Sequence, residues 1–256
     1  MKTFCLLLVL SFVMPSHRPM TNDAKPVEQP VVILKTFDSF LSYYGQYVKL
    51  ESDFAALDES SHVVTKDAFL KLMTTGKYLP LRLQSKSAEP VYQLYKLNPS
   101  ISSRITECLK GWAADYYSKY SKLGKPLPQF SFVDINGNTY TNANTRGRIL
   151  VLKGWDLSCP PCIREIPELN KLVDKYHDRK DIVFVSMVPE DENKVKSFLA
   201  QHPFSYPVVA RQPFFQNVLQ LSFVPCHIVV NKDGNVACVT FSVEELEGEL
   251  AKETKS

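Results

Sequence analysis

Two cysteines separated by two prolines, within the stretch GWDLSCPPCIREIP at 154–167, constrain the fold of this chain more than any other feature. The run RILVLKGW at 148–155 comes directly before them, and its continuous apolar, β-branched character predicts a strand buried on both faces. After them, apolar residues recur at helical spacing and predict a helix over 160–178. This order places Cys159 at the N-cap of the helix and Cys162 one turn later.

Strands and helices alternate around this unit. Hairpins are predicted over 130–141, where Asn136-Gly137 forms the turn, and over 227–241. The remaining segments predict, in order, a buried strand, a short helix, a short strand, a helical turn and a closing helix over 181–188, 191–201, 206–209, 214–220 and 243–252. Strands that alternate with helices form a parallel core sheet, whose sites lie beyond the carboxyl ends of the strands. We therefore predict an α/β fold with the two cysteines at such an end.

The first half of the chain has a different pattern. It predicts helices and strands over 36–49, 65–73, 78–84, 91–97 and 101–123, with Pro80 restricting the first strand to a sheet edge. Cys108 lies on the apolar stripe of the last helix, and we expect a core residue there. The breaker-rich segment 124–128 then suggests a boundary between a smaller, helix-rich α+β domain over 31–123 and a second domain over 124–256. The first domain contains no chemical motif, and we expect it to act in docking or substrate selection.

The beginning of the sequence indicates an exported protein. Met1-Lys2 precedes a mostly apolar run from Thr3 to Met14, which is too short to span a bilayer and predicts a signal peptide over 1–16. A polar linker over 17–30 follows; the alternative is an N-terminal strand or helix of a cytosolic protein. The formal net charge of +3 is dispersed, so we expect no nucleic-acid partner, and no transmembrane span once the signal is removed.

The paired cysteines allow three interpretations. A zinc site needs four ligands, and the chain has no second Cys-x-x-Cys to complete one. A structural disulfide stays open, although a chain of 256 residues with 45% hydrophobic residues does not need such a staple. The order of buried strand, cysteine pair and helix favours a catalytic dithiol, in which Cys159 attacks and Cys162 resolves the mixed disulfide. The Cys159–Cys162 pair would then carry the electrons as a dithiol and form a redox-active disulfide when oxidised, and no metal or organic cofactor is expected.

The two prolines affect the chemistry that we expect of Cys159. A thiolate is the attacking species in disulfide exchange, and the unpaired N–H groups of a helix N-terminus stabilise it. Proline is favourable in the first helical turn but has no N–H, so the sulfur would rely on the N–H groups of Cys162 and Ile163. We therefore expect a lowered pKa for the Cys159 thiol, lowered less than with two donor-bearing residues between the cysteines.

Further residues stand at fixed positions around the pair. Trp155 lies four residues before Cys159, Glu165 and Pro167 lie three and five residues after Cys162, and Val224-Pro225 precedes the strand HIVV. Together with the two cysteines they resemble the TlpA/ResA-like periplasmic thiol–disulfide oxidoreductases of the thioredoxin-like superfamily. The resemblance covers about residues 123–254, roughly half of the chain.

The resemblance implies a thioredoxin fold, which is a central mixed sheet flanked by helices with an N-terminal hairpin. In this fold Pro225 is cis and faces the dithiol. It implies that Glu165 accepts a proton or tunes the dithiol, unless it only favours the helix N-terminus. Val224 would pair through its backbone with the partner peptide, and Trp155 would either pack in the core or contact the substrate. A disulfide-bearing protein would be the substrate, a membrane thiol donor would supply the electrons, and the compartment would be the periplasm.

Three positions depart from the family pattern. Ser158 stands where many relatives have Trp, and Lys153 stands where thioredoxins keep a buried acid. We expect the Lys153 side chain to run to the surface, although it could instead stabilise a thiolate. Cys226 follows Pro225, where Thr is usual. We expect Cys226 and Cys238 to be small buried residues, and a disulfide between them stays open.

Reduction of protein disulfides is the function that these residues favour, ahead of their oxidation. A peroxiredoxin-like thiol peroxidase, on the same fold, is an alternative, but the pattern Pro-x-x-x-Thr-x-x-Cys of that class is absent. Counting back from Cys159, Asp156 occupies the Thr position and Leu152 the Pro position. A second alternative is a non-catalytic protein that binds partners on a thioredoxin scaffold.

Overall fold

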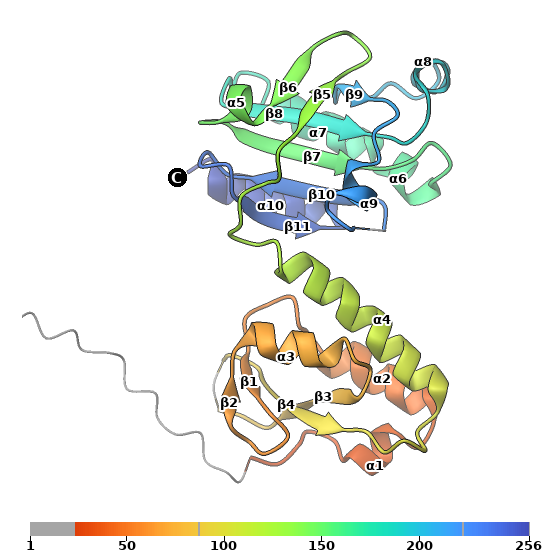
Figure 1. Cartoon of the computed structure of the whole chain (residues 1–256), viewed down its shortest axis with the longest axis vertical. Helices are drawn as coiled ribbons and strands as arrows, with labels where there is room; N and C mark the ends of the chain where they lie inside the picture. Colours follow the sequence, from red (N-terminus) through yellow and green to blue (C-terminus); the bar gives the residue numbers. More distant parts are fainter. Residues whose placement is uncertain (1–23, 87, 222, 256) are drawn as a thin grey trace, which may run out of the picture.

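The computed structural model describes residues 24–86, 88–221 and 223–255. The predicted signal peptide over 1–16, and residues 17–23 of the predicted linker, lie outside these ranges. Within them, no helix is both long and apolar enough to cross a membrane. Figure 1 shows two bodies, each built around its own sheet and joined by helix α4, Ser103–Tyr120.

The first body contains a four-stranded sheet of order β2-β1-β4-β3. Its elements are α1 (Pro30–Ile33), α2 (Phe37–Tyr47), β1 (Ala55–Leu57), β2 (Val63–Val64), α3 (Lys66–Met73), β3 (Tyr78–Leu83) and β4 (Val91–Lys96). β3 is an edge strand, as Pro80 predicts, and pairs antiparallel with β4. The sequence does not predict α1, β1 or β2, because segments of two to four residues are too short to show a period.

Threonine side chains start the two longer helices before α4. The Thr36 and Thr65 hydroxyls accept the backbone N–H groups of Ser39 and Ala68, which have no partner inside their own helices. The core that these helices cover is rich in aromatic side chains, and Cys108 packs against it as a half-buried free thiol. The position of Cys108 on the apolar stripe therefore agrees with the prediction.

The second body contains a five-stranded sheet of order β11-β10-β7-β8-β9. Its elements are β5 (Ser131–Val133), β6 (Thr139–Thr141), α5 (Asn142–Thr145), β7 (Ile149–Gly154), α6 (Pro160–Arg164), α7 (Ile166–Lys175), β8 (Ile182–Met187), α8 (Glu192–Leu199), β9 (Val208–Val209), α9 (Phe214–Asn217), β10 (Cys226–Val230), β11 (Val236–Thr240) and α10 (Val243–Glu253). β7, β8 and β9 run parallel, and β10 and β11 pair antiparallel with their neighbours. The predicted mixed sheet flanked by helices, after the hairpin β5-β6, is confirmed.

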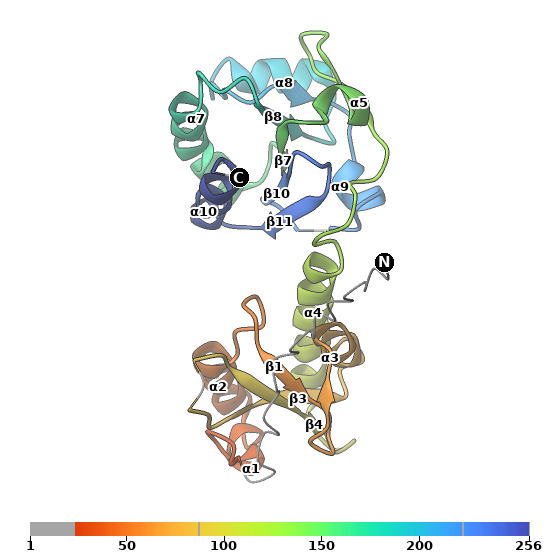
Figure 2. The ribbon, with the colours of Figure 1, turned by 90° about the vertical axis from the view of Figure 1, so that its left-hand side faces the viewer.

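Helices lie on both faces of this sheet (Figure 2). Side chains alternate along β7, so that Leu150 and Leu152 face a core closed by α9 and the hairpin, while Ile149 and Val151 face α7 and α10. Lys153 continues the second set and therefore points into the helix layer that includes α7. Next to it, a Cβ on Gly154 would lie 2.6 Å from the Phe215 ring, so the close packing of α9 requires glycine there.

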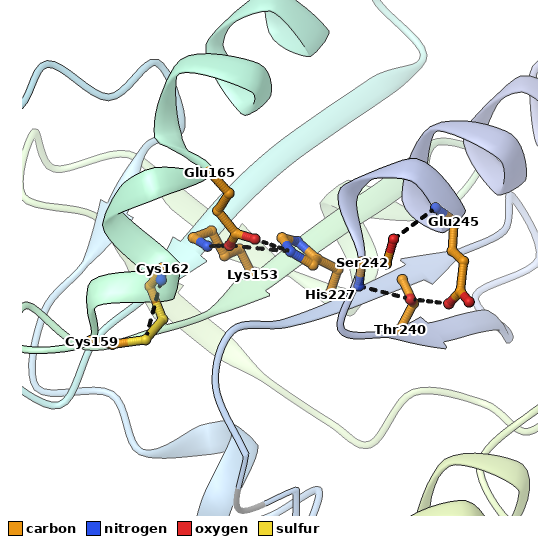
Figure 3. Close-up of polar contacts among 8 residues, drawn as sticks. All are labelled: Lys153, Cys159, Cys162, Glu165, His227, Thr240, Ser242 and Glu245. Atoms are coloured by element: carbon orange, nitrogen blue, oxygen red, sulfur yellow. Dashed lines mark hydrogen bonds and ion pairs between the residues drawn. A yellow bond between two sulfur atoms is a disulfide. The ribbon is translucent and has the colours of Figure 1, made fainter. Parts of the chain in front are cut away.

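The helix predicted over 160–178 is in fact two helices, α6 and α7, which meet at Glu165. Pro167 accounts for the break, because it has no N–H to donate to the carbonyl of Ile163. The break makes Glu165 the residue that precedes α7, and its side chain points toward the sheet (Figure 3).

The two bodies touch along the end of α4. The Ser118 hydroxyl donates to the carbonyl of Gln220 at 3.2 Å, and the Lys119 ammonium lies 3.9 Å from the centroid of the Phe241 ring. Immediately after α4, the backbone of Gly124 donates to Val236 of β11. The first body is thereby held next to the loop that leads into β10.

Candidate redox site

Cys159 and Cys162 form a disulfide at the N-terminus of α6, with 5.3 Å between their Cα atoms. Cys159 is the N-cap residue, as predicted, and its sulfur accepts the backbone N–H of Cys162 at 3.2 Å. Cys159 is 8% exposed, whereas Cys162 is completely buried. Of the two sulfurs, the one at position 159 is therefore the one that a partner can reach.

The prediction of two backbone donors for Cys159 is wrong in one respect. The N–H of Ile163 donates to the carbonyl oxygen of Cys159 at 3.1 Å, which is the first hydrogen bond of the helical ladder. With Pro160 and Pro161 unable to donate, the N–H of Cys162 is the backbone donor that remains for the sulfur.

An apolar cluster surrounds the disulfide. Trp155, Cys159 and Cys162 belong to it, and Trp155 is 1% exposed, with its ring 5.6 Å from those of Phe198 and Phe204. Of the two roles considered for Trp155, the position corresponds to packing in the core rather than to a surface on which a substrate lies. The cluster shields the disulfide from water on the side of α8.

The loop before β10 forms the other wall of the site. The Val224–Pro225 peptide bond is cis, as predicted, and Val224 packs against the apolar cluster that holds both cysteines. Phe223 comes directly before and is 56% exposed. The loop thus places a partly buried Val224 against the cysteine cluster and an exposed apolar side chain, that of Phe223, directly before it.

Behind the disulfide, Glu165 meets two basic side chains from the sheet (Figure 3). Its carboxylate accepts a hydrogen bond from the Lys153 ammonium, and His227 Nε2 lies 3.3 Å from Oε1 and 3.4 Å from Oε2. Both basic side chains are completely buried. The expectation that Lys153 runs to the surface is therefore wrong, because its ammonium finds a carboxylate inside the protein.

Sequence reasoning considered His227 only as a coincidental zinc ligand and gave it no place at the redox site. The signal available was a basic residue at the start of the otherwise apolar run HIVV. Its partner could not be found from that signal, because the contact depends on the antiparallel register in which His227 lies opposite Lys153.

The three side chains shift one another's protonation. Burial would raise the pKa of Glu165, but the hydrogen bond from His227 and the charge of Lys153 together lower it below its ordinary value. Burial lowers the pKa of Lys153 and that of His227, and in each case Glu165 opposes the change. At neutral pH the carboxylate is therefore ionised.

Three thiols within the described ranges are free, those of Cys108, Cys226 and Cys238. Cys226 is buried, as predicted, on the opposite face of β10 from His227, and burial raises its pKa to about 12. Cys238 is only half-buried, less than expected, and pairs across the hairpin with Val229. No 226–238 disulfide forms, because this register does not bring the two cysteines opposite each other. Within the described ranges, no three His, Cys, Asp or Glu side chains gather closely enough to hold a metal ion.

Known proteins similar to this chain share the region that holds the disulfide. The thiol-disulfide oxidoreductase ResA of Bacillus cereus is 28% identical over 141 residues, which cover 54% of this chain and 78% of that protein. The thioredoxin-like protein YneN of Bacillus subtilis is 23% identical over 151 residues, covering 55% and 88% of the two chains. The solved thioredoxin domain of a thiol-disulfide oxidoreductase from Bacteroides vulgatus is 20% identical, with a TM-score of 0.45 over 51% of this chain and 96% of that one.

The enzyme class that these relatives and the bonded pair support is thiol–disulfide oxidoreductase. The Redoxin family matches residues 122–252, half of the chain, from the end of α4 to α10. This chain belongs to the Redoxin family, and within the thioredoxin superfamily it is similar to the ResA-type thiol–disulfide oxidoreductases.

Proposed function

We propose that this protein reduces disulfides in partner proteins with the Cys159–Cys162 dithiol. The observation that carries the proposal is the asymmetry of the pair: Cys159 lies at a helix N-terminus and keeps 8% of its surface exposed, whereas Cys162 next to it is completely buried. An exposed thiolate and a protected second thiol are what attack followed by resolution requires. The electrons reside in the two sulfurs, so the proposal includes no metal or organic cofactor.

The reaction proceeds in two exchanges. The Cys159 thiolate attacks a disulfide of the partner, a bond forms between Cys159 and one partner sulfur, and the other partner sulfur leaves as a thiolate. Cys162 then gives up its proton, which the first released partner thiolate takes up, and attacks the sulfur of Cys159; this re-forms the observed disulfide and releases the second partner sulfur as a thiolate. Two electrons pass to the partner, and a separate thiol donor must restore the dithiol.

The partner's polypeptide is proposed to lie along Val224. The cis bond at Pro225 and the packing of Val224 against the cysteine cluster support this placement, since the backbone of Val224 is then next to the attacked bond. Extended segments bind in this way by pairing their main chain with an available edge.

A trapping experiment tests the proposed reaction. Cys162→Ser should leave the mixed disulfide unresolved, so that partner proteins accumulate covalently bound through Cys159, and insulin reduction should fall by about a hundredfold or more. Cys159→Ser, the matched control, should bind no partner covalently. Wild-type protein that leaves insulin disulfides intact in the presence of a dithiol donor would contradict the proposal.

The direction of electron flow depends on the reduction potential. A pair that reduces its partners must have a potential below theirs, whereas a strong oxidant has a higher one. Equilibrating the wild-type pair with glutathione or dithiothreitol buffers measures this, and a potential as high as that of the periplasmic oxidants would replace reduction by oxidation.

Export to the periplasm is part of the proposal. Its support is the charged and apolar beginning of the sequence and the oxidising environment in which a dedicated reductant is needed. A membrane-associated thiol donor would then supply the electrons. Cell fractionation checks the compartment, and a fully cytosolic protein would argue against it.

A further inference from the structure

Lys153, Glu165 and His227 form a closed group behind the dithiol, and the proposed reaction does not yet use any of them. Lys153 and His227 lie opposite each other on β7 and β10, and both side chains reach the Glu165 carboxylate from the sheet (Figure 3). Glu165 approaches from the junction of α6 and α7, three residues after Cys162. The group therefore ties the strand pair to the helix that carries the disulfide.

The hydrogen-bonding pattern assigns a state to His227. Its Nε2 faces a carboxylate, so this nitrogen carries the hydrogen and donates it. Its Nδ1 is buried and has no hydrogen-bond partner among the described residues. A neutral ring leaves a lone pair there, whereas a protonated ring would leave an unpaired N–H and a third charge in the interior, which is more costly. His227 acts as a neutral donor, and the group as a whole carries no net charge.

The other titratable groups near Lys153, Glu165 and His227 do not change the net charge of this part of the interior. The hydroxyl of Tyr206 is buried and also lacks a partner among the described residues. Burial and the charge of Glu165 raise its pKa, so this hydroxyl stays neutral. Cys226 lies on the opposite face of β10, and burial keeps its thiol protonated. On the side of α10, Glu245 is bonded to the Thr240 hydroxyl, and Cys162 lies on α6 with its sulfur bonded to that of Cys159 (Figure 3).

We propose that Lys153 and His227 are positioning residues for the redox reaction: they hold the Glu165 carboxylate hydrogen-bonded and neutralised, so that no net negative charge opposes thiolate formation at the cysteine pair. This inference rests on the proposed function of the pair. A lone carboxylate at this place would disfavour a second negative charge on sulfur. The lysine cancels that charge, and the imidazole supplies the second donor that keeps the carboxylate in place.

The charge balance sets the direction of each effect. Lys153→Met leaves the carboxylate uncompensated, so the pH midpoint for alkylation of reduced Cys159 should rise by roughly one unit, about tenfold less thiolate at fixed pH. Glu165→Gln leaves the lysine uncompensated, so the midpoint should fall. In Lys153→Met/Glu165→Gln both charges are absent, and the midpoint should return to within about a third of a unit of wild type.

Two variants of His227 distinguish its role as a hydrogen-bond donor from the charge role of Lys153. His227→Leu removes the donor and should move the alkylation midpoint upward, as Lys153→Met does. His227→Gln keeps an N–H donor but cannot take up a proton, so it should restore the wild-type profile. A Gln variant that behaves like the Leu variant would show that the donor role is wrong.

The experiment measures the alkylation profile and the reduction potential of the full-length protein as a function of pH. Lys232→Met is the matched control, because Lys232 lies beyond the other end of β10 and pairs with Asp181. Wild-type profiles in Lys153→Met and His227→Leu would overturn the inference, as would a downward shift in Lys153→Met. If Lys153→Met fails to fold, the double variant and the two His227 variants decide.

Failure of this inference differs from failure of the proposed function. The potential and the alkylation profile are properties of the cysteine pair and need no partner protein. A wild-type protein that does not reduce insulin refutes the proposed function, whereas an active wild type with unshifted variants refutes only the role of Lys153 and His227.

Discussion

Two basic side chains lie in the interior of the second body, Lys153 and His227, with one carboxylate between them. Taking an ionisable group out of water disfavours its charged form, and burial accordingly lowers the pKa of both bases. A buried set of charged side chains is costly for stability unless every charge is paired. Because Lys153, Glu165 and His227 lie behind the disulfide, we expect them to contribute to the chemistry of the sulfurs.

The stability of the protein should fall in mild acid because of His227. Its pKa in the folded state is lowered from 6.5, so the unfolded chain binds a proton that the folded protein does not as the pH falls through that value. The contribution of His227 to the free energy of unfolding is fully present above pH 6.5. Below that pH it declines by up to about 1.4 kcal/mol for each pH unit. Urea unfolding at a series of pH values measures the slope.

His227→Gln should remove that part of the slope, because glutamine does not titrate. His202 is exposed, so His202→Gln is the matched control and should leave the slope as it is. An unchanged slope in His227→Gln would show that another group causes the acid destabilisation.

Helix α6 has an N-terminus adapted to one sulfur. Pro160 and Pro161 occupy its first two positions, where proline fits the backbone but donates nothing. The Cys159 sulfur consequently accepts a single backbone hydrogen bond, from Cys162. The element thus combines a rigid start with a limited capacity to stabilise a thiolate.

Pro161→Ala should strengthen that capacity. The new N–H belongs to the second helical residue, one of the two from which a cap accepts. We expect the alkylation midpoint of Cys159 to fall by about half a pH unit, roughly threefold more thiolate at fixed pH. Thiolate absorbance against pH measures it. Pro160→Ala is the control, because the N–H of the first residue does not reach the cap; equal shifts in both variants would contradict this geometry.

In the molecule as a whole, α4 brings the first body next to the loop that precedes Pro225. A hollow of about 160 Å³ lies between α4 and the loop before Pro225, lined by Ala114, Asp115, Ser118, Gln220, Leu221, Phe223 and Phe241. Phe223 lines the hollow and is the residue directly before Val224. A partner segment that extends beyond Val224 would therefore meet both bodies, which gives the first body a proposed part in partner selection.

Phe223→Ala should weaken the use of protein substrates without affecting the chemistry. We expect KM for a protein disulfide to rise about fivefold to tenfold with kcat maintained, the loss typical of an apolar side chain at an interface centre. A small aromatic disulfide, which needs no such contact, should be reduced at the wild-type rate. Val218→Ala, on an exposed apolar residue farther from Val224 in the chain, is the control. Equal losses for both substrates would contradict a role in recognition.

Local patterns were sufficient for much of this structure. The run 148–155, the cysteine pair and the helical spacing after it predict β7, the N-cap position of Cys159 and α6, because each depends on residues close in sequence. Short elements such as β1 and β2 carry too few residues to show a period, and their existence depends on pairing with β4.

Local sequence preferences are enough to specify the strand–disulfide–helix unit, since backbone preferences, capping and the missing donors of proline act within a few residues. The environment of that unit depends instead on how distant segments pack together. Lys153 could have reached water, but the register of β7 against β10 places it opposite His227, and the helix break at Glu165 supplies the carboxylate between them. Buried charges need partners, and those partners came from three separate segments of the chain.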